Sequence, residues 1–575
     1  MVLCPKAECN GDVDLPHMIS LGVNYSQMHD SSACITRDGE ILFAVAEERL
    51  SRVKHDAAFP YLAIRACLDF TGIKPGELDF VCFGWPRVGA GTRHDAKCML
   101  SGAYPINYVN VASMMKRYAS MTSQGSGERA FHRTFGATRT KFRFVDHHLA
   151  HAISAYSYSG FDDSAILVID GRGAWEASSL WHGRNGTLEH VWTIPWPNSL
   201  GLFYAQFTSY LGFAPYSDEW KVMGLAPYGK PGADLREFLK VDGDSYRVSN
   251  RLLFGNSSST MAQIEARFGP RRVPESDIEQ RHKDIAFAVQ DTCETAMLHL
   301  ARIAVRRTGS RNLCLAGGVA LNSKANGKIL SSGIVDRIFV QPAAGDDGVC
   351  LGAALTPFLD GGGKVPVREM RDAYWGPQSC DAEIERTLRS YKIRFSHADD
   401  PAAVAASLIS GGKMIGWFQG RMEFGPRALG NRSILADPRD PKMTEKVNNA
   451  VKFREPWRPF APSILRESAE KYIESATDSP FMILTAQVRP EMRAVIPAVT
   501  HVDGSARPQT VEREVNPLYW GLIRSFEELT GVPVVMNTSF NLRGEPIVAT
   551  PTEAIRTFFS SGMDALMIGS FLVEK

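Results

Sequence analysis

Residues 164–171 read "SAILVIDG". It is a strongly apolar run that ends in Asp-Gly, which is typical of a strand that opens on a cleft. Two further β-rich runs, "ASSLWHG" and "TLEHVWTI", follow it, and Asn185-Gly186 between them is a favoured pair for a tight turn. The pattern predicts a strand-turn-strand-turn-strand unit over residues 164–194.

The same unit occurs earlier in the chain. The runs "HMISLGVNYS", "SACITRDG" and "EILFAVAEE" lie within residues 17–48, and Asp38-Gly39 separates the last two. Helical patterns follow each copy, at residues 60–73 and 282–309. Duplicated β-units with helices between them indicate an α/β protein, and a cleft enclosed between the two copies is the natural place for a ligand.

The composition is that of a globular protein with several domains. The 575 residues are 44% hydrophobic and 22% charged, enough for two to four domains. The formal net charge of +1 gives no general attraction for nucleic acid or anionic lipid, so we expect neither nucleic acid nor a membrane as a partner. The ten cysteines include no C-x-x-C pair, and we find no secretory signal or membrane-spanning run, so we expect a cytoplasmic protein.

A second domain is predicted after residue 370. Residues 357–370, "PFLDGGGKVPVREM", mix glycines with prolines and are interpreted as the linker. Residues 402–418 then predict a helix and a strand, and "VPVVMNTSFN" predicts a strand that runs into a loop. Between them, the arginine- and proline-containing stretches "FGPRALGNRSIL" and "VKFREPWRPFAPSIL" are predicted to be loops with fixed geometry.

His147 and His151 are candidates for a metal site. They stand four residues apart in a run that reads as a helix, so both imidazoles leave the helix on one face. Asp346, in a glycine-flanked loop, and Asp170, at the end of an apolar strand, are candidate carboxylate ligands. Such a set suits Fe(II), Mn(II) or Zn(II), and the alternative is a pair of half-buried histidines bonded to backbone. A zinc protease is disfavoured because His148 stands where its glutamate base is required.

Three further positions carry possible chemistry, each with a simpler alternative. His29 in "MHDSSACI" is a candidate proton acceptor or a turn histidine. Lys54 in "EERLSRVKHD" either binds an anion or faces solvent. Gly317 and Gly318 follow an apolar strand, where backbone N–H groups can approach a phosphate or ribose, or where the chain simply turns tightly.

Taken together, the motifs resemble one family over nearly the whole chain, from about residue 20 to the C-terminus. This is the family of O-carbamoyltransferases of the antibiotic-biosynthesis and nodulation-factor type. The resemblance rests on ten ordered motifs: "HDSSA", "EERLSRVKHD", "DHHLAHA", "DGRGAWEA", "DEWKVMGLAPYGK", "GGVALNSKANG", "GDDGVCLGAA", "GRMEFGPRALGNRSIL", "KFREPWRPFAPSIL" and "NTSFNLRGEPIV".

The resemblance implies two fused α/β domains. Residues 20–365 would form a duplicated actin-like (ribonuclease-H-like), metal-binding domain, and residues 370–575 a YrdC-like domain. In the family, the second domain makes carbamoyl adenylate from ATP and carbamoyl phosphate, with Mg accompanying the ATP. The first domain passes the carbamoyl group to a hydroxyl of a small molecule. Residues 1–19, with Cys4 and Cys9, have no counterpart in the motif pattern and form an N-terminal extension.

The resemblance also implies roles for individual residues. His147, His151 and Asp346 match the metal ligands, usually for iron, and His29 matches the base for the acceptor hydroxyl. A further set matches positions that bind the nucleotide or the carbamoyl adenylate: Lys54, Asp170, Gly317, Gly318, Arg427, Lys452, Arg458, Asn537, Ser539 and Asn541.

Two other classes of function share parts of this pattern. A tRNA-modifying enzyme of the threonylcarbamoyl type has both domain folds, but it predicts a basic surface that the net charge does not favour. A nucleotide- or metal-binding regulator would need only one site, whereas candidates occur in both domains. The acceptor is left open, although residues 84–120, rich in Tyr, Met and small residues, favour a neutral and partly apolar molecule. A homodimer is also left open.

Overall fold

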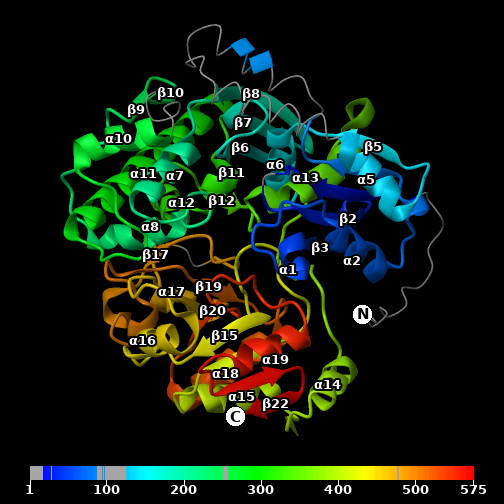
Figure 1. Ribbon diagram of the computed structural model, residues 1–575, viewed down its shortest axis with the longest axis vertical. Helices are drawn as coiled ribbons and strands as arrows, with labels where there is room; N and C mark the ends of the chain where they lie inside the picture. The colour runs from blue at the N-terminus through cyan, green and yellow to red at the C-terminus, as the bar shows by residue number, and fades with distance from the viewer. Residues whose placement is uncertain are drawn as a thin grey trace.

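The computed structural model describes residues 17–27, 29–86, 93–94, 96–97, 125–249, 257–475 and 478–575. Most of the predicted N-terminal extension lies outside these residues, and so does most of the predicted acceptor segment 84–120. The described chain is built on two five-stranded sheets in its N-terminal part and one eight-stranded sheet in its C-terminal part (Figure 1).

The first sheet has the strand order β3-β2-β1-β4-β5. Its strands β1, β2 and β3 form an antiparallel meander, and β4 and β5 lie parallel to β1. The bounds are β1 (Ile19–Asn24), β2 (Ser32–Arg37), β3 (Glu40–Ala46), β4 (Phe80–Phe83) and β5 (Lys141–Phe144).

The second sheet repeats the first. Strands β6, β7 and β8 form the meander, β11 and β12 lie parallel to β6, and the order is β8-β7-β6-β11-β12. Both meanders turn through a residue pair with left-handed backbone, since φ is +50° and +77° at Asp38-Gly39 and +49° and +81° at Asn185-Gly186. The predicted duplication and α/β class are confirmed. The bounds are β6 (Asp163–Ile169), β7 (Glu176–Arg184), β8 (Thr187–Pro195), β11 (Asn312–Ala316) and β12 (Arg337–Val340).

Helices follow each meander, as the sequence predicts. The patterns at residues 60–73 and 282–309 are α2 and α11, and both helices end at a glycine with positive φ, Gly72 and Gly309. The described α-helices of this part are α1 (Glu47–Ser51), α2 (Tyr61–Thr71), α5 (Gly125–Phe135), α6 (His147–Tyr156), α7 (Leu200–Tyr210), α8 (Glu219–Leu225), α10 (Ser257–Phe268), α11 (Gln280–Thr308), α12 (Ser323–Ser331) and α13 (Val349–Leu355), and a hairpin joins β9 (Leu239–Asp242) to β10 (Ser245–Val248).

Helix α13 packs tightly against both β1 and α6. A Cβ atom on Gly352 would stand 1.8 Å from the carbonyl oxygen of Ala150 in α6, and one on Gly22 would stand 1.9 Å from that of Cys350. Only glycine allows backbones to approach this closely. These two contacts fix the start of α13, and the segment before it, relative to α6.

The C-terminal sheet is mixed, with the order β13-β22-β21-β14-β15-β20-β16-β19. Apolar residues alternate between its faces: Ile415 and Trp417 pack with α15 and α18, whereas Phe418 packs with α14 and α19. The strands are β13 (Ser396–His397), β14 (Ile415–Phe418), β15 (Arg432–Ala436), β16 (Ala461–Leu465), β19 (Gln509–Val511), β20 (Val534–Ser539), β21 (Ala565–Ile568) and β22 (Phe571–Glu574), with a small pair β17 (Ala486–Gln487) and β18 (Ser505–Ala506). The α-helices are α14 (Asp381–Ser390), α15 (Pro401–Ser410), α16 (Met443–Val447), α17 (Ala469–Tyr472), α18 (Pro517–Thr530) and α19 (Pro551–Phe559).

One prediction for this part is wrong in extent. The stretches "FGPRALGNRSIL" and "VKFREPWRPFAPSIL" are not loops throughout, because their last residues form the interior strands β15 and β16. The apolar ends of both stretches are buried in the sheet, and that burial outweighs the signal of the preceding prolines and glycines.

The C-terminal part, yellow to red in Figure 1, lies against both N-terminal units. On one side, Arg52 donates to the carbonyl oxygens of Pro546 and Ile547 at 2.6 and 2.7 Å. On the other, Asn326 donates to the carbonyl oxygen of Ile483 at 3.1 Å, and Lys324 pairs with Asp503 at 2.6 Å. No helix of the described residues combines the length and the apolar character that a bilayer crossing requires.

Candidate active site

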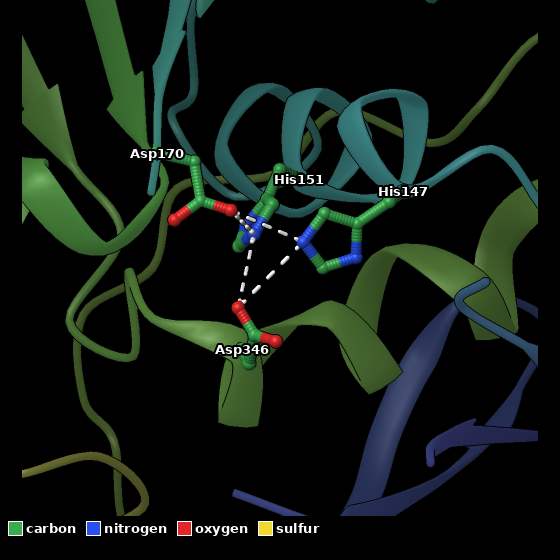
Figure 2. Close-up of side chains that lie close together, drawn as sticks. All are labelled: His147, His151, Asp170 and Asp346. Atoms are coloured by element: carbon green, nitrogen blue, oxygen red, sulfur yellow. Dashed lines mark hydrogen bonds and ion pairs between the residues drawn. The ribbon is translucent and has the colours of Figure 1, made fainter. Parts of the chain in front are cut away.

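Four predicted side chains meet where the two N-terminal units face each other (Figure 2). Asp146 caps α6 by accepting the backbone N–H of Leu149 at 3.0 Å, so His147 and His151 lie on its first two turns. Asp170 directly follows β6, and Asp346 starts the short helix that leads into α13. The pattern of two histidines on one helix face is confirmed, and both carboxylates lie opposite that face.

The four side chains are close enough to bind one ion. The Nε2 atom of His147 lies 3.2 Å from Asp170 Oδ2 and 3.6 Å from Asp346 Oδ1, and His151 Nε2 lies 3.9 and 4.0 Å from the same two oxygens. One ligand atom from each residue falls within 4.8 Å of all the others. All four residues are buried.

Their hydrogen bonding fits a metal. His147 Nδ1 lies 3.2 Å from the carbonyl oxygen of Gly84, an arrangement that fixes the ring and leaves Nε2 as the ligand atom. Both ring nitrogens of His151 are buried without a hydrogen-bond partner among the described residues. Such an unsatisfied group is costly unless a ligand completes it.

The charges point the same way. Burial lowers the pKa of His147, but Asp346 and Asp170 outweigh that effect and raise the pKa to about 10. Burial, with the charge of His147, lowers the pKa of His151 to about 4. A bound dication would replace the proton that His147 shares with the two buried carboxylates. A set of two imidazoles and two carboxylates fits Fe(II), Mn(II) or Zn(II).

Asp170 is one of the four residues that could hold an ion, a set that we name the metal cluster: His147, His151, Asp170 and Asp346. Its Oδ2 faces the histidines, while its Oδ1 accepts the backbone N–H groups of Gly171 at 2.8 Å and Gly318 at 3.2 Å. The N–H of Gly318 is therefore bonded within the protein. Gly317 has a φ of +87°, and a Cβ there would stand 2.4 Å from the carbonyl oxygen of Ile169. The glycine pair thus lets the chain turn tightly against β6 and orients Asp170.

His29 lies on the loop between β1 and β2, close enough to Asp346 and Asp170 for their charges to act on its imidazole. Burial lowers its pKa, but the charge of Asp346 and the hydrogen bond and charge of Asp30 outweigh burial and raise the pKa to about 9. A cation bound between Asp346 and Asp170 would cancel much of that field and return the imidazole toward its neutral, proton-accepting form. Lys54 is exposed on the turn after α1, and its ammonium pairs with no carboxylate of the described residues.

A second cluster, of arginines, lies in the C-terminal part. Burial alone lowers the pKa of Arg427 to about 10, and burial partly offset by Glu455 lowers the pKa of Arg458 to about 10. Two arginines that the sequence interpretation missed, Arg454 and Arg507, join them, and each has a buried nitrogen without a partner among the described residues. Burial and the three other guanidinium groups lower the pKa of Arg507 well below its usual range.

This arginine cluster is nearly free of counter-charge. Among the residues that the structure describes, Glu455 is the carboxylate that pairs with the cluster, at 3.5 Å from Arg458. The guanidinium carbon of Arg458 lies 3.4 Å from the ring centre of Trp220, in α8 of the N-terminal part. Four cations held close together with so few carboxylates are costly unless an anion completes them, so the cluster is suited to a polyphosphate.

The other predicted residues of the C-terminal part support this cluster. The Nζ atom of Lys452 lies 2.5 to 3.3 Å from four oxygens, the main-chain and side-chain oxygens of Ser539 and Asn541, and its three N–H groups donate to them. Its ammonium therefore orders the chain at these two residues. Asn537 donates to Ser463 Oγ at 3.1 Å, while its own Oδ1 is buried without a partner among the described residues.

Comparison with known proteins identifies the family of this chain. A family model described as the N-terminus of carbamoyltransferases matches residues 19–355, and one described as their C-terminus matches residues 406–575. The chain belongs to the carbamoyltransferase family. The metal cluster thus lies in the segment matched by the first model, and the arginine cluster in the segment matched by the second.

Similar chains cover nearly the same length as this carbamoyltransferase. It is 40% identical to the nodulation protein NolNO of Sinorhizobium fredii over 98% of this chain and 82% of that one. It is 39% identical to an uncharacterized protein, sll1178, of Synechocystis over 98% of this chain and 97% of that one. Among solved structures, HypF of T. kodakarensis aligns with 60% of this chain and 48% of that chain at a TM-score of 0.34 and 14% identity, too low to support any conclusion.

The residues missed in this carbamoyltransferase differ in how detectable they are. Arg454 lies inside the quoted motif "KFREPWRPFAPSIL", so its position two residues after Lys452 was a usable signal. Arg507 lies in "SARPQT", which resembles an ordinary turn, and only the fold brings it to the cluster.

Proposed function

We propose that this carbamoyltransferase is an ATP-dependent O-carbamoyltransferase that works through carbamoyl adenylate. In the first reaction, carbamoyl phosphate, ATP and one water molecule would give carbamoyl adenylate, pyrophosphate and phosphate. In the second, an acceptor hydroxyl attacks the carbamoyl carbon, the bond to the adenylate oxygen breaks, and AMP and a proton leave. The observation that carries the proposal is the arginine cluster, which supplies cations for a polyphosphate directly against α8 of the N-terminal part.

The first reaction is assigned to the C-terminal part, residues 370–575, for which we propose the YrdC-like fold. Arg427, Arg454, Arg458 and Arg507 would bind the phosphates of ATP, which enters with Mg, and of carbamoyl phosphate. Planar guanidinium groups suit this task because each can donate two hydrogen bonds to one phosphate. Lys452 would order the loop of Ser539 and Asn541, and Asn537 would offer its unpartnered Oδ1 to the carbamoyl amide.

The second reaction is assigned to the N-terminal part, residues 20–365, for which we propose the actin-like fold. His147, His151, Asp170 and Asp346 would hold a divalent transition metal. When bound, such a metal neutralises charge on a phosphate and polarises a carbonyl oxygen. His29, close to the same cluster, accepts the proton of the attacking hydroxyl, and Lys54 on the adjacent turn is available for the adenylate phosphate. A closed path between the two clusters would protect the adenylate from water.

The proposed acceptor is a small molecule with a free hydroxyl group. The near-neutral composition supports this class over RNA, since an RNA-binding enzyme needs a basic surface. The predicted acceptor segment 84–120 lies mostly outside the described residues, so the preference for a neutral, partly apolar acceptor stays a prediction.

The test is pyrophosphate release from ATP and Mg, with and without carbamoyl phosphate and with no acceptor present. We expect release that depends on carbamoyl phosphate and a carbamoyl adenylate peak in the mass spectrum. Arg458→Ala should abolish both but still transfer the carbamoyl group from supplied carbamoyl adenylate, whereas Arg236→Ala, which alters an exposed arginine, should behave as the parent enzyme. Pyrophosphate release at the same rate with and without carbamoyl phosphate would rule out the adenylate route.

A further inference from the structure

His29 does not stand alone beside the metal cluster. Its Nδ1 lies 3.1 Å from Asp30 Oδ2, and the other oxygen of Asp30 lies 2.8 Å from Nδ1 of His55. The Nε2 atom of His55 lies in turn 3.0 Å from Ser217 Oγ. Three segments that are far apart in the sequence thus form one continuous hydrogen-bonded chain, which we name the His29 relay: His29, Asp30, His55 and Ser217.

The backbone around the His29 relay is strained at three places. Asp30 and His55 have φ values of +55°, and Tyr216, directly before Ser217, has +64°. Left-handed backbone is uncommon outside glycine and costs free energy, most of all for a bulky residue such as tyrosine. Such strain persists where the surrounding structure requires a particular side-chain placement. Here two of the strained residues, Asp30 and His55, belong to the relay, and the third, Tyr216, directly precedes its member Ser217.

The far end of the relay is anchored to the arginine cluster. The carbonyl oxygen of Ser217 accepts the indole N–H of Trp220 at 2.8 Å, and the guanidinium group of Arg458 lies over the Trp220 ring. In the same segment, Lys221 lies 3.0 Å from Asp218 and 3.1 Å from Glu455, the carboxylate that pairs with Arg458. Residues 217–221 therefore join the relay, of which Ser217 is the last member, to the proposed adenylation site.

From this geometry we propose that Asp30 and His55 are positioning residues for carbamoyl transfer, which hold His29 with its Nε2 directed at the acceptor hydroxyl. The inference rests on the proposed function, in which His29 is the base. Asp30 accepts the Nδ1 proton of His29, so the proton-free nitrogen is Nε2. His55, held by Ser217, occupies the second oxygen of Asp30 and fixes the carboxylate plane. The relay passes no proton onward; it orients the imidazole and stabilises its protonated form during the reaction.

The test measures transfer of the carbamoyl group from supplied carbamoyl adenylate to an accepted alcohol, with metal-loaded enzyme. Asp30→Asn should lower kcat at least about 100-fold with KM for the alcohol changed less than about twofold, because orientation and not binding is lost. The acid limb of the pH–kcat profile should also move to lower pH, since one of the charges that face His29 is gone while Asp346 and Asp170 remain. His55→Gln should lower kcat about tenfold. Asp69→Asn, which alters an exposed surface carboxylate, is the matched control.

The outcomes separate the two proposals. If His29→Ala still transfers the carbamoyl group, the base assignment fails and the relay fails with it. If His29→Ala is inactive but Asp30→Asn and His55→Gln keep the parent kcat and pH profile, the relay alone is overturned. Pyrophosphate release from ATP and carbamoyl phosphate, measured on the same preparations, reports whether each variant is folded. If Asp30→Asn also loses pyrophosphate release, it is not correctly folded, and the kcat of His55→Gln then decides whether the relay acts on His29.

Discussion

At the scale of single residues, one buried carboxylate organises the loop that carries Arg427. The Oε1 atom of Glu423 accepts the backbone N–H groups of Leu429, Asn431 and Arg432 at 2.6 to 3.2 Å. Removing this carboxylate leaves three backbone N–H donors unpaired in a buried place. Glu423→Ala should therefore lower the free energy of unfolding by about 3 kcal/mol and reduce pyrophosphate release.

Thermal denaturation measures that loss, and Glu491→Ala, at an exposed position, serves as its control. If Glu423→Ala melts with the parent enzyme while pyrophosphate release falls, the carboxylate acts on a ligand directly and the structural explanation is wrong. If both quantities stay unchanged, the three hydrogen bonds contribute nothing to the site.

A second prediction at this scale concerns the metal. His151 has two buried ring nitrogens without partners among the described residues, so its imidazole is available to a metal. Elemental analysis of purified enzyme should find about one divalent transition metal per chain, and His151→Ala should lose it. Transfer from supplied carbamoyl adenylate should fall with the metal, while carbamoyl phosphate-dependent pyrophosphate release continues. His190→Ala, at an exposed histidine, should keep the metal, and full metal content in His151→Ala would contradict the assignment.

At the scale of elements, the close crossing of α6 and α13 sets the metal site. Helix α6 begins at His147, α13 begins three residues after Asp346, and Gly352 allows the backbones of the two helices to touch. Gly352→Ala would place a methyl group 1.8 Å from the carbonyl oxygen of Ala150, so one helix must shift. We expect lower thermal stability and at least about tenfold weaker metal binding, measured by titration with a chelator.

Gly76→Ala is the control for this crossing. A Cβ at Gly76 has no neighbour within 4 Å, so its thermal stability and metal binding should match the parent enzyme. An unchanged metal affinity in Gly352→Ala, together with a lower melting temperature, would show that the metal site tolerates movement of α13.

The elements also show what sequence alone can predict. Local signals were sufficient where they act over a few residues: the Asp38-Gly39 and Asn185-Gly186 turns, and helices that end at Gly72 and Gly309. They were insufficient for β15 and β16, because burial in a sheet depends on distant partners such as β20. The same division holds in the site. The helix spacing of His147 and His151 was readable, whereas the fold alone brings Arg507 to Arg458.

At the scale of the whole molecule, the proposed reaction depends on how the two parts dock. The adenylate would form at the arginine cluster and react at the metal cluster, so any opening between the parts exposes it to water. Arg52, after α1, bonds the carbonyl oxygens of Pro546 and Ile547 and lies 3.5 Å from Glu553, so one side chain joins the two parts on the side of α1. Its guanidinium group is mostly buried, with 18% of the side chain exposed, so water does not replace these bonds without cost.

Arg52→Ala should therefore uncouple the two reactions without abolishing either. In the parent enzyme, about one pyrophosphate should be released per carbamoylated acceptor, because the intermediate is protected. In Arg52→Ala that ratio should rise several-fold, with the excess adenylate hydrolysed, while transfer from supplied carbamoyl adenylate continues. Arg65→Ala, which removes an exposed arginine of α2, should keep the parent ratio. A ratio unchanged in Arg52→Ala would mean that docking at this side does not enclose the intermediate, and that contacts such as Lys324 with Asp503 suffice.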